Sequence, residues 1–187
     1  MKKENFKFKN NRNYIHGTDI FNFLIKKKNY KLIDIKFKKP LNFQPIITRS
    51  SKINDINACV SSSVIKNKRK IKTLIFNSNK KIKSKYVIDE DIPLNNIKLF
   101  KNEAKCNFIT KKSPIEILVT LTKIFHLKKI SKKKWLFTRI VLKSNFKQGL
   151  KRIFKISLDQ NYGNTSTVCK IYENNKNIGL INFTVKQ

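Results

Sequence analysis

The stretch "SPIEILVTLTKIFHLKK", residues 113–129, predicts the main helix of the fold. Ser113 is a preferred N-cap residue, and Glu116 three positions later completes a capping box. Pro114 suits the first helical position, where its missing N–H removes no hydrogen bond. Apolar residues recur with helical spacing at positions 115, 118, 119, 121, 124 and 125. We therefore expect a helix that is buried along much of its surface.

Four strand-like segments follow this helix, at 134–144, 152–159, 166–173 and 177–185. The first is apolar on both faces, and the others alternate apolar and polar residues to different degrees. The turn-forming stretches "DQNYGNT" and "ENNKN" separate the last three segments. A helix followed by strands with short connections predicts an α+β fold with a mostly antiparallel sheet.

The first half of the chain shows the same order of elements. An apolar stretch at 19–28 should be helical, and strand-like segments follow at 31–39, 43–50, 57–65 and 71–78. The bridging stretch 79–112 holds the acidic cluster "DED" at 89–91 and a strand-like piece, "NIKLF". We expect two units with a repeated pattern, 10–92 and 93–187, each a central helix with an antiparallel sheet, after a basic flexible arm at 1–9.

The charge of the chain is strongly positive, with 43 Lys and Arg against 11 Asp and Glu and a net charge of +32. Such a balance suggests a polyanionic partner, with nucleic acid as the first candidate. However, Lys, Asn and Ile dominate together, and all three have codons rich in A and T, whereas Arg is scarce. Compositional drift in an AT-rich genome therefore also explains this lysine-rich sequence, and no RNP, KH or zinc-finger motif supports nucleic-acid binding.

The three cysteines, Cys59, Cys106 and Cys169, are far apart and form no CxxC motif. This spacing argues against a zinc site or a disulfide framework, and we expect free thiols in a reducing cytoplasm, with no metal and no cofactor. No apolar run approaches the roughly 20 residues that span a bilayer. The basic N-terminus lacks the apolar stretch of a secretory signal.

The stretch "NRNYIHGTD", residues 11–19, concentrates scarce residue types immediately before the first predicted helix. The chain has only two histidines and four glycines, and His16 and Gly17 are adjacent here. The unperturbed pKa of histidine lies near neutrality, and backbone N–H groups at a helix start favour developing negative charge. The alternative is an ordinary helix start, with Thr18 or Asp19 as the N-cap and His16 in a turn. The other histidine, His126, is expected to be structural.

A long apolar helix wrapped by a curved antiparallel sheet resembles the hot-dog fold, and two such units in one chain resemble the double hot-dog proteins. That group includes MaoC-like enoyl hydratases and hydroxyacyl-thioester dehydratases. MaoC-like hydratases carry the pattern Asp, any residue, Asn, Pro, aliphatic, His before the central helix. In residues 11–16, Asn13, Ile15 and His16 match this pattern, whereas Asn11 stands in place of the catalytic Asp and Tyr14 in place of Pro.

The resemblance implies a hydratase or dehydratase, a lyase acting on acyl-CoA or acyl-carrier-protein thioesters, which could form a homodimer. In that reading His16 and Asp19 are catalytic, with Asp19 replacing the missing family acid. The residues that would bind substrate are Asn11, Asn13, Gly17 and Thr18. Because Asn11 cannot act as a base, a non-catalytic hot-dog scaffold subunit is an alternative. A basic nucleic-acid-binding or ribosome-associated protein is the other.

Overall fold

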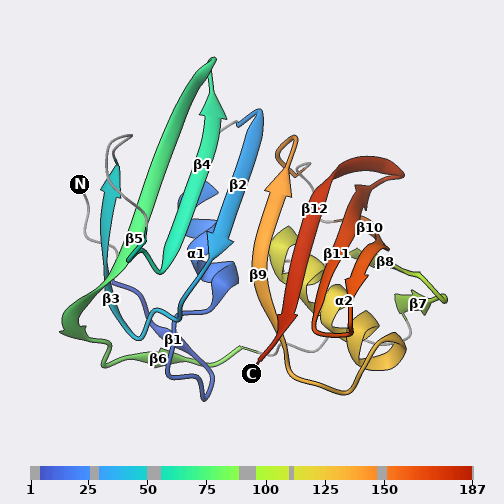
Figure 1. Cartoon of the computed structure of the whole chain (residues 1–187), viewed down its shortest axis with the longest axis horizontal. Helices are drawn as coiled ribbons and strands as arrows, with labels where there is room; N and C mark the ends of the chain where they lie inside the picture. Colours follow the sequence, from blue (N-terminus) through green and yellow to red (C-terminus); the bar gives the residue numbers. More distant parts are fainter. Residues whose placement is uncertain are drawn as a thin grey trace.

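The computed structural model describes residues 5–25, 30–49, 56–88, 96–109, 112–146 and 151–186. Within these ranges lie a ten-stranded antiparallel sheet, a small parallel pair of strands and two helices (Figure 1). The helices are α1 (Gly17–Ile25) and α2 (Pro114–Lys129). The strands are β1 (Phe8–Lys9), β2 (Leu32–Phe37), β3 (Phe43–Arg49), β4 (Val60–Lys66), β5 (Arg69–Lys81), β6 (Lys85–Tyr86), β7 (Ile97–Leu99), β8 (Glu103–Ile109), β9 (Trp135–Leu142), β10 (Lys151–Tyr162), β11 (Ser166–Glu173) and β12 (Lys176–Val185).

The predicted α+β class and the mostly antiparallel sheet are confirmed. Helix α2 begins directly after Ser113, whose backbone N–H donates to Glu116 Oε2 at 3.0 Å, as the capping box predicted. Each strand-like segment of the sequence overlaps a strand. The apolar stretch 19–28 overlaps α1, which begins two residues earlier, at Gly17. The lysines at 26–28, the acidic cluster at 89–91 and the expected boundary between residues 92 and 93 lie outside the described residues.

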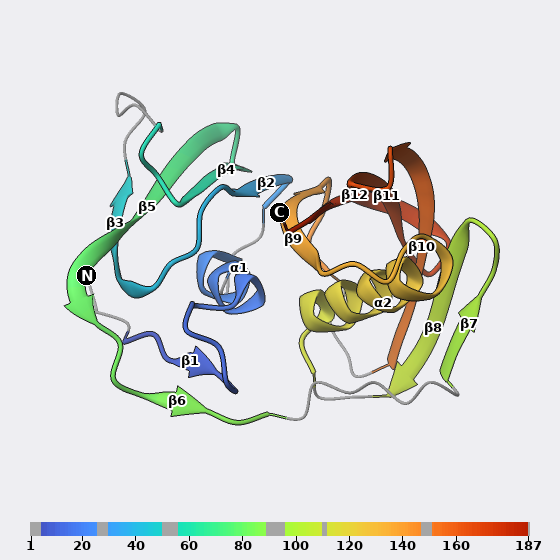
Figure 2. The same cartoon turned by 60° about the horizontal axis from the view of Figure 1, so that its bottom comes forward.

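Both helices lie on the same side of the large sheet, each inside the curve of one half (Figure 2). Helix α1 lies inside the curve of β2 to β5, and α2 lies inside the curve of β8 to β12. The buried face of α2 includes Ile115, Leu118, Leu121 and Phe125, none of which has exposed surface. The apolar helical stripe read from the sequence is therefore the face that α2 turns toward the sheet.

The two halves connect their strands differently, although their element order is similar. The sheet order is β3-β5-β4-β2 in the first half and β9-β12-β11-β10 in the second. In the first half, β2 lies beside β4, the third strand after helix α1. In the second half, β9 lies beside β12, the fourth strand after helix α2. The expected repeat therefore holds for the order of elements along the chain and not for strand neighbours.

Strands β2 and β9 join the halves into one sheet. They pair antiparallel, with Ile33 opposite Leu142 and Ile35 opposite Ile140, and these four side chains are fully buried. On the other face of the sheet, Arg139 binds Asp34 through two hydrogen bonds, of 2.9 Å from Nε and 2.7 Å from Nη2. Backbone pairing, core packing and a bidentate ion pair thus act at the same junction.

The segment expected to be a flexible arm packs against the fold in its described part, residues 5–9. Phe6 is 7% exposed, and its ring meets the ring of Phe23 edge-on at 5.3 Å. The backbone of Phe6 also exchanges two hydrogen bonds with the side chain of Gln44. Strand β1 then pairs with β6, so this part of the segment is held rather than free, a departure from the expectation.

The cysteines are free and buried, as expected. Burial raises the pKa of the thiols of Cys106 and Cys169 to about 12, so both stay protonated at neutral pH. Among the described residues, no group of His, Cys, Asp and Glu side chains could hold a metal ion.

Neither of the described helices is long and apolar enough to cross a bilayer.

His126 is a fully buried core residue. Its ring stacks on that of Trp135 at 4.4 Å, and Nε2 lies 2.6 Å from the hydroxyl oxygen of Thr167. Burial lowers the pKa of His126 to about 4, so the ring is neutral at pH 7. The expected structural role of this histidine is thereby confirmed.

We predict that acid destabilises the fold through His126. As the pH falls from 6.5 towards 4, His126 takes up a proton in the unfolded chain but stays mostly neutral in the native protein. The free energy of unfolding should fall by about 2–3 kcal/mol over this range. The His126→Phe variant keeps an aromatic ring that can stack on Trp135. Its free energy of unfolding, measured by urea denaturation at several pH values, should change less between pH 6.5 and 4.5 than that of the unaltered protein. The same slope in both proteins would contradict this assignment.

Candidate functional site

Helix α1 begins next to the junction of the two halves because Gly17 has no side chain. A Cβ atom there would lie 3.1 Å from Cδ1 of Phe137 and 3.5 Å from Cε1 of Phe37. These rings come from β9 and β2 and pack on each other with centroids 4.7 Å apart. Glycine therefore lets the positive end of the α1 dipole approach the centre of the molecule.

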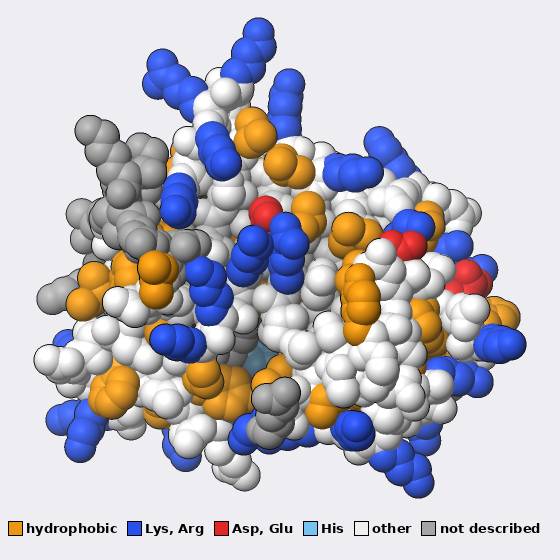
Figure 3. Space-filling view, in the orientation of Figure 1, with side chains coloured by type: hydrophobic (Ala, Val, Ile, Leu, Met, Phe, Trp, Pro, Cys, Tyr) orange, Lys and Arg blue, Asp and Glu red, His pale blue; other side chains and the backbone are white. Residues whose placement is uncertain are grey.

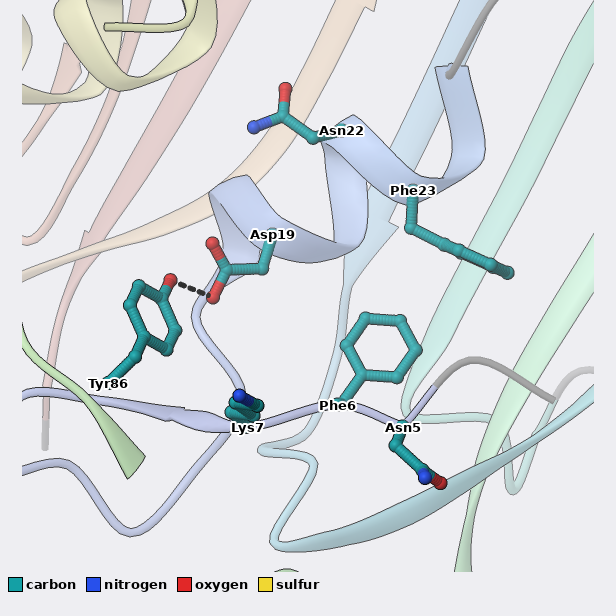
Figure 4. A pocket seen from close by; sticks show the side chains of 7 residues that line it. All are labelled: Asn5, Phe6, Lys7, Asp19, Asn22, Phe23 and Tyr86. Atoms are coloured by element: carbon teal, nitrogen blue, oxygen red, sulfur yellow. Dashed lines mark hydrogen bonds between the residues drawn. The ribbon is translucent and has the colours of Figure 1, made fainter. Parts of the chain in front are cut away.

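Asp19 lies in the first turn of α1, and its carboxyl group has both a side-chain hydrogen bond and a raised pKa. The hydroxyl of Tyr86 donates a hydrogen bond to Asp19 Oδ2 at 2.7 Å (Figure 4). Burial raises the pKa of this carboxyl, and the charge of Glu116 adds to the rise. The Tyr86 hydrogen bond and the charges of Lys9 and Arg12 lower it without cancelling the rise. Asp19 can therefore accept and release a proton more readily near neutrality than an exposed aspartate.

A hollow of about 360 Å³ opens beside Asp19. It is lined by Asn5, Phe6, Lys7, Asp19, Asn22, Phe23 and Tyr86 (Figure 4). Figure 4 shows Asp19 and Tyr86 facing one another at one end, with the rings of Phe6 and Phe23 side by side at the other. The hollow thus combines one titratable polar end with an apolar wall, which is the usual character of a small-molecule site.

The N-terminal end of α2 is joined to β1 and to the middle of α1. Lys9 Nζ lies 2.8 Å from Glu116 Oε1, and the Lys9 side chain is only 3% exposed. Asn22 of α1 also donates a hydrogen bond of 3.2 Å to the hydroxyl of Ser113, the residue before α2. These contacts tie the start of the chain and α1 to the start of α2.

Glu116 and Asp19 have opposite pKa shifts. Burial raises the pKa of Glu116, but hydrogen bonds from Lys9 and Ser113 and the charge of Lys9 together bring it below its ordinary value. Glu116 is therefore a structural group that is ionised at neutral pH, whereas Asp19, with its raised pKa, is the group better suited to proton transfer. Separation of two neighbouring carboxyls in this way is how acid–base roles are divided in a site.

The structure places the sequence-predicted site residues in two different surroundings. His16 is 9% exposed, and its Nδ1 lies 2.7 Å from the hydroxyl of fully buried Thr18. His16 thus bonds to Thr18 while Asp19 bonds to Tyr86, so the two predicted catalytic residues have different partners. Of the two histidines, only His16 has any exposed surface.

Asn11 and Asn13 are exposed and do not line the hollow beside Asp19. They line a second, larger hollow instead. The residues that sequence reasoning missed are Phe6, Phe23 and Tyr86 around Asp19, and Lys9 as the partner of Glu116. Tyr86 lies 67 positions from Asp19, and no local pattern announces such a contact.

No protein-family model and no curated protein matches this sequence. The solved structures that this chain resembles include two from mycobacteria. One is a tesB protein of Mycobacterium avium subspecies paratuberculosis, with a TM-score of 0.48 and 8% identity over 96% of this chain and 89% of that one. The other is an acyl-CoA thioesterase II, TesB2, of Mycobacterium marinum, with a TM-score of 0.40 and 5% identity over 85% of this chain and 81% of that one. Similarity this distant transfers no residue roles to this chain.

We predict that Asp19→Asn stabilises the protein at neutral pH. Because the pKa of Asp19 is raised in the native state, its contribution to stability is present below pH 3.8 and is lost as pH rises through the native pKa. The amide removes that loss, so the midpoint of thermal unfolding should rise at pH 7. Asp34→Asn is the matched control, because its carboxylate is paired with Arg139, and it should destabilise by about 0.5–1 kcal/mol. A lower midpoint for Asp19→Asn would contradict the prediction.

Proposed function

We propose that this chain is a hot-dog-type acyl-thioester hydrolase, acting on thioesters of coenzyme A or of acyl carrier protein. The observation that carries the proposal is Asp19, a carboxyl of raised pKa at the start of a buried helix, facing a hollow with an apolar wall. The position of each helix inside the curve of one half-sheet supports two hot-dog-like units (Figure 2). Their different strand orders make the first unit a variant of the second.

In the proposed reaction the acyl chain lies against Phe6 and Phe23, and the thioester carbonyl lies near the start of α1. Ionised Asp19 takes a proton from a water molecule, whose oxygen attacks the carbonyl carbon. The developing oxyanion is stabilised by the positive end of the α1 dipole. The carbon–sulfur bond then breaks, and Asp19 returns its proton to the departing thiolate. Tyr86 orients the carboxylate through its hydrogen bond.

Hydrolysis fits this hollow better than the hydration expected from the MaoC-like resemblance. Hydration needs a base for the α-proton and a separate group for the β-oxygen. His16, the candidate for one of these roles, shares its hydrogen bond with buried Thr18 and is not among the residues that line the hollow beside Asp19. Hydrolysis needs a single group that takes up and returns one proton, and Asp19 can do both.

The two alternatives from the sequence differ in what they require. A non-catalytic scaffold subunit remains consistent with an exposed Asn11 in place of an acid. A nucleic-acid-binding protein requires basic residues gathered on one surface. On the face seen in Figure 3, Lys and Arg are scattered among other side chains. Of the three, only the hydrolase proposal uses the raised pKa of Asp19 and the hollow beside it.

We predict that Asp19→Asn lowers kcat for acyl-CoA hydrolysis by about 100-fold or more, since the amide cannot accept a proton. Release of free thiol from acyl-CoA substrates of graded chain length measures the reaction, and His16→Ala serves as the matched variant that should retain most activity. Hydrolysis unaffected by Asp19→Asn would overturn the assignment. Hydration of enoyl-CoA that His16→Ala abolishes would favour the MaoC-like reaction instead.

We also predict that Tyr86 sets the pH dependence of the reaction. Because Asp19 acts in its ionised form, kcat/KM should rise with pH through a midpoint above 3.8. The Tyr86 hydrogen bond lowers the pKa of Asp19, so Tyr86→Phe should move this midpoint to higher pH. A change in rate with no shift in the pH profile would mean that Tyr86 acts only through packing.

A further inference from the structure

A second hollow, larger than the one beside Asp19, lies between segment 10–14, the C-terminal part of α2 and the start of β9. Its volume is about 680 Å³. It is lined by Asn10, Asn11, Arg12, Asn13, Tyr14, Lys123, Leu127, Lys132, Lys133, Lys134, Trp135 and Leu136. We call it the basic hollow. The reaction proposed for the site beside Asp19 uses none of these side chains.

The charge of the basic hollow is of one sign. Of the described residues that line it, Arg12, Lys123 and the three lysines at 132–134 are basic, and none is acidic. The end of the α2 dipole contributes only roughly half a negative charge. Five cationic side chains outweigh it, and a concave surface concentrates their field on a bound anion. The hollow is therefore suited to a ligand with several negative charges.

Uncharged side chains give the basic hollow a second feature. Tyr14 and Leu127 contribute an aromatic ring and an exposed aliphatic side chain, and Leu127 is 46% exposed. Asn11 and Asn13 add amide groups that can donate and accept hydrogen bonds. A phosphate alone would use only the cations. A planar base attached to phosphates would use the cations, the ring and the amides together.

We propose that the basic hollow binds a nucleoside bisphosphate, the adenosine 3′,5′-bisphosphate part of coenzyme A. The identity of the nucleotide as a thioester carrier rests on the proposed function. Nearby parts of one segment line the two hollows, residues 5–7 in one and residues 10–14 in the other. The charge of Arg12, which lines the basic hollow, lowers the pKa of Asp19 in the other. A carrier held at the basic hollow therefore lies against the segment that leads into α1.

Isothermal titration of the full chain with adenosine 3′,5′-bisphosphate tests the proposal. Saturable binding that weakens with salt is expected, together with weaker binding of adenosine and of inorganic phosphate. The double variant Lys132→Glu/Lys133→Glu should lose about tenfold or more in affinity. Lys70→Glu/Lys101→Glu makes the same change in charge at exposed positions outside the hollow and should bind as the unaltered protein does.

Tyr14→Ala separates recognition of the base from attraction of the phosphates. It should weaken binding of the bisphosphate and leave binding of inorganic phosphate unchanged. Equal losses in the two double-lysine variants would overturn the proposal, because they would reflect net charge alone. So would an absence of binding, or displacement of the bisphosphate by a single-stranded RNA oligonucleotide that binds more tightly, which would indicate a nucleic-acid surface.

The same titration distinguishes failure of this proposal from failure of the proposed hydrolase. The bisphosphate contains no thioester, so its binding does not depend on turnover. Asp19→Asn should bind it unchanged. If the protein binds the bisphosphate but does not hydrolyse acyl-CoA, the nucleotide site stands and the role of Asp19 is rejected. If it hydrolyses acyl-CoA with a KM that Lys132→Glu/Lys133→Glu does not change, only the nucleotide site is rejected.

Discussion

The pairing of β2 with β9 is the constraint on which the rest of the structure depends. It makes one continuous sheet of two half-sheets and removes two edge strands that would otherwise be open to other chains. It also brings Phe37 and Phe137 together, and their rings form the surface against which Gly17 packs. The start of α1, and with it the position of Asp19, follows from that contact.

The carboxyl groups of Glu116 and Asp19 have different partners, and only Glu116 is bound by the buried cation of Lys9. Lys9 binds Glu116 and so satisfies the capping residue of α2, while Asp19 receives a hydrogen bond from a neutral hydroxyl. Burial acts to raise the pKa of both carboxyls, but hydrogen bonds from Lys9 and Ser113 bring the pKa of Glu116 below its ordinary value. The effects of Tyr86, Lys9 and Arg12 do not cancel the rise at Asp19, so the site keeps one group whose protonation can change.

Local patterns predicted most elements, because capping, periodicity and turns act over a few residues. Strand β8 was missed because small Ala104 and Cys106, alternating with polar residues, give a weak strand signal. Strand neighbours were not predictable, since the choice of β4 or β5 beside β2 is made by tertiary packing. In the site, the start of α1 was found, whereas Asn11 and Asn13, which were grouped with it, line the other hollow. Nearness in sequence does not decide which side of a segment a side chain faces.

The junction between the halves also has a consequence for the time course of folding. Hairpins such as β4–β5 and β11–β12 close over a few residues, whereas Asp34 and Arg139 meet from positions 105 apart. The entropy of closing a loop grows with its length, and pairings of distant segments slow folding. Each half can therefore acquire local order before the other contacts it. Gly17 packs against Phe137 of the second half, so the start of the helix that carries Asp19 takes its final position only at this late step.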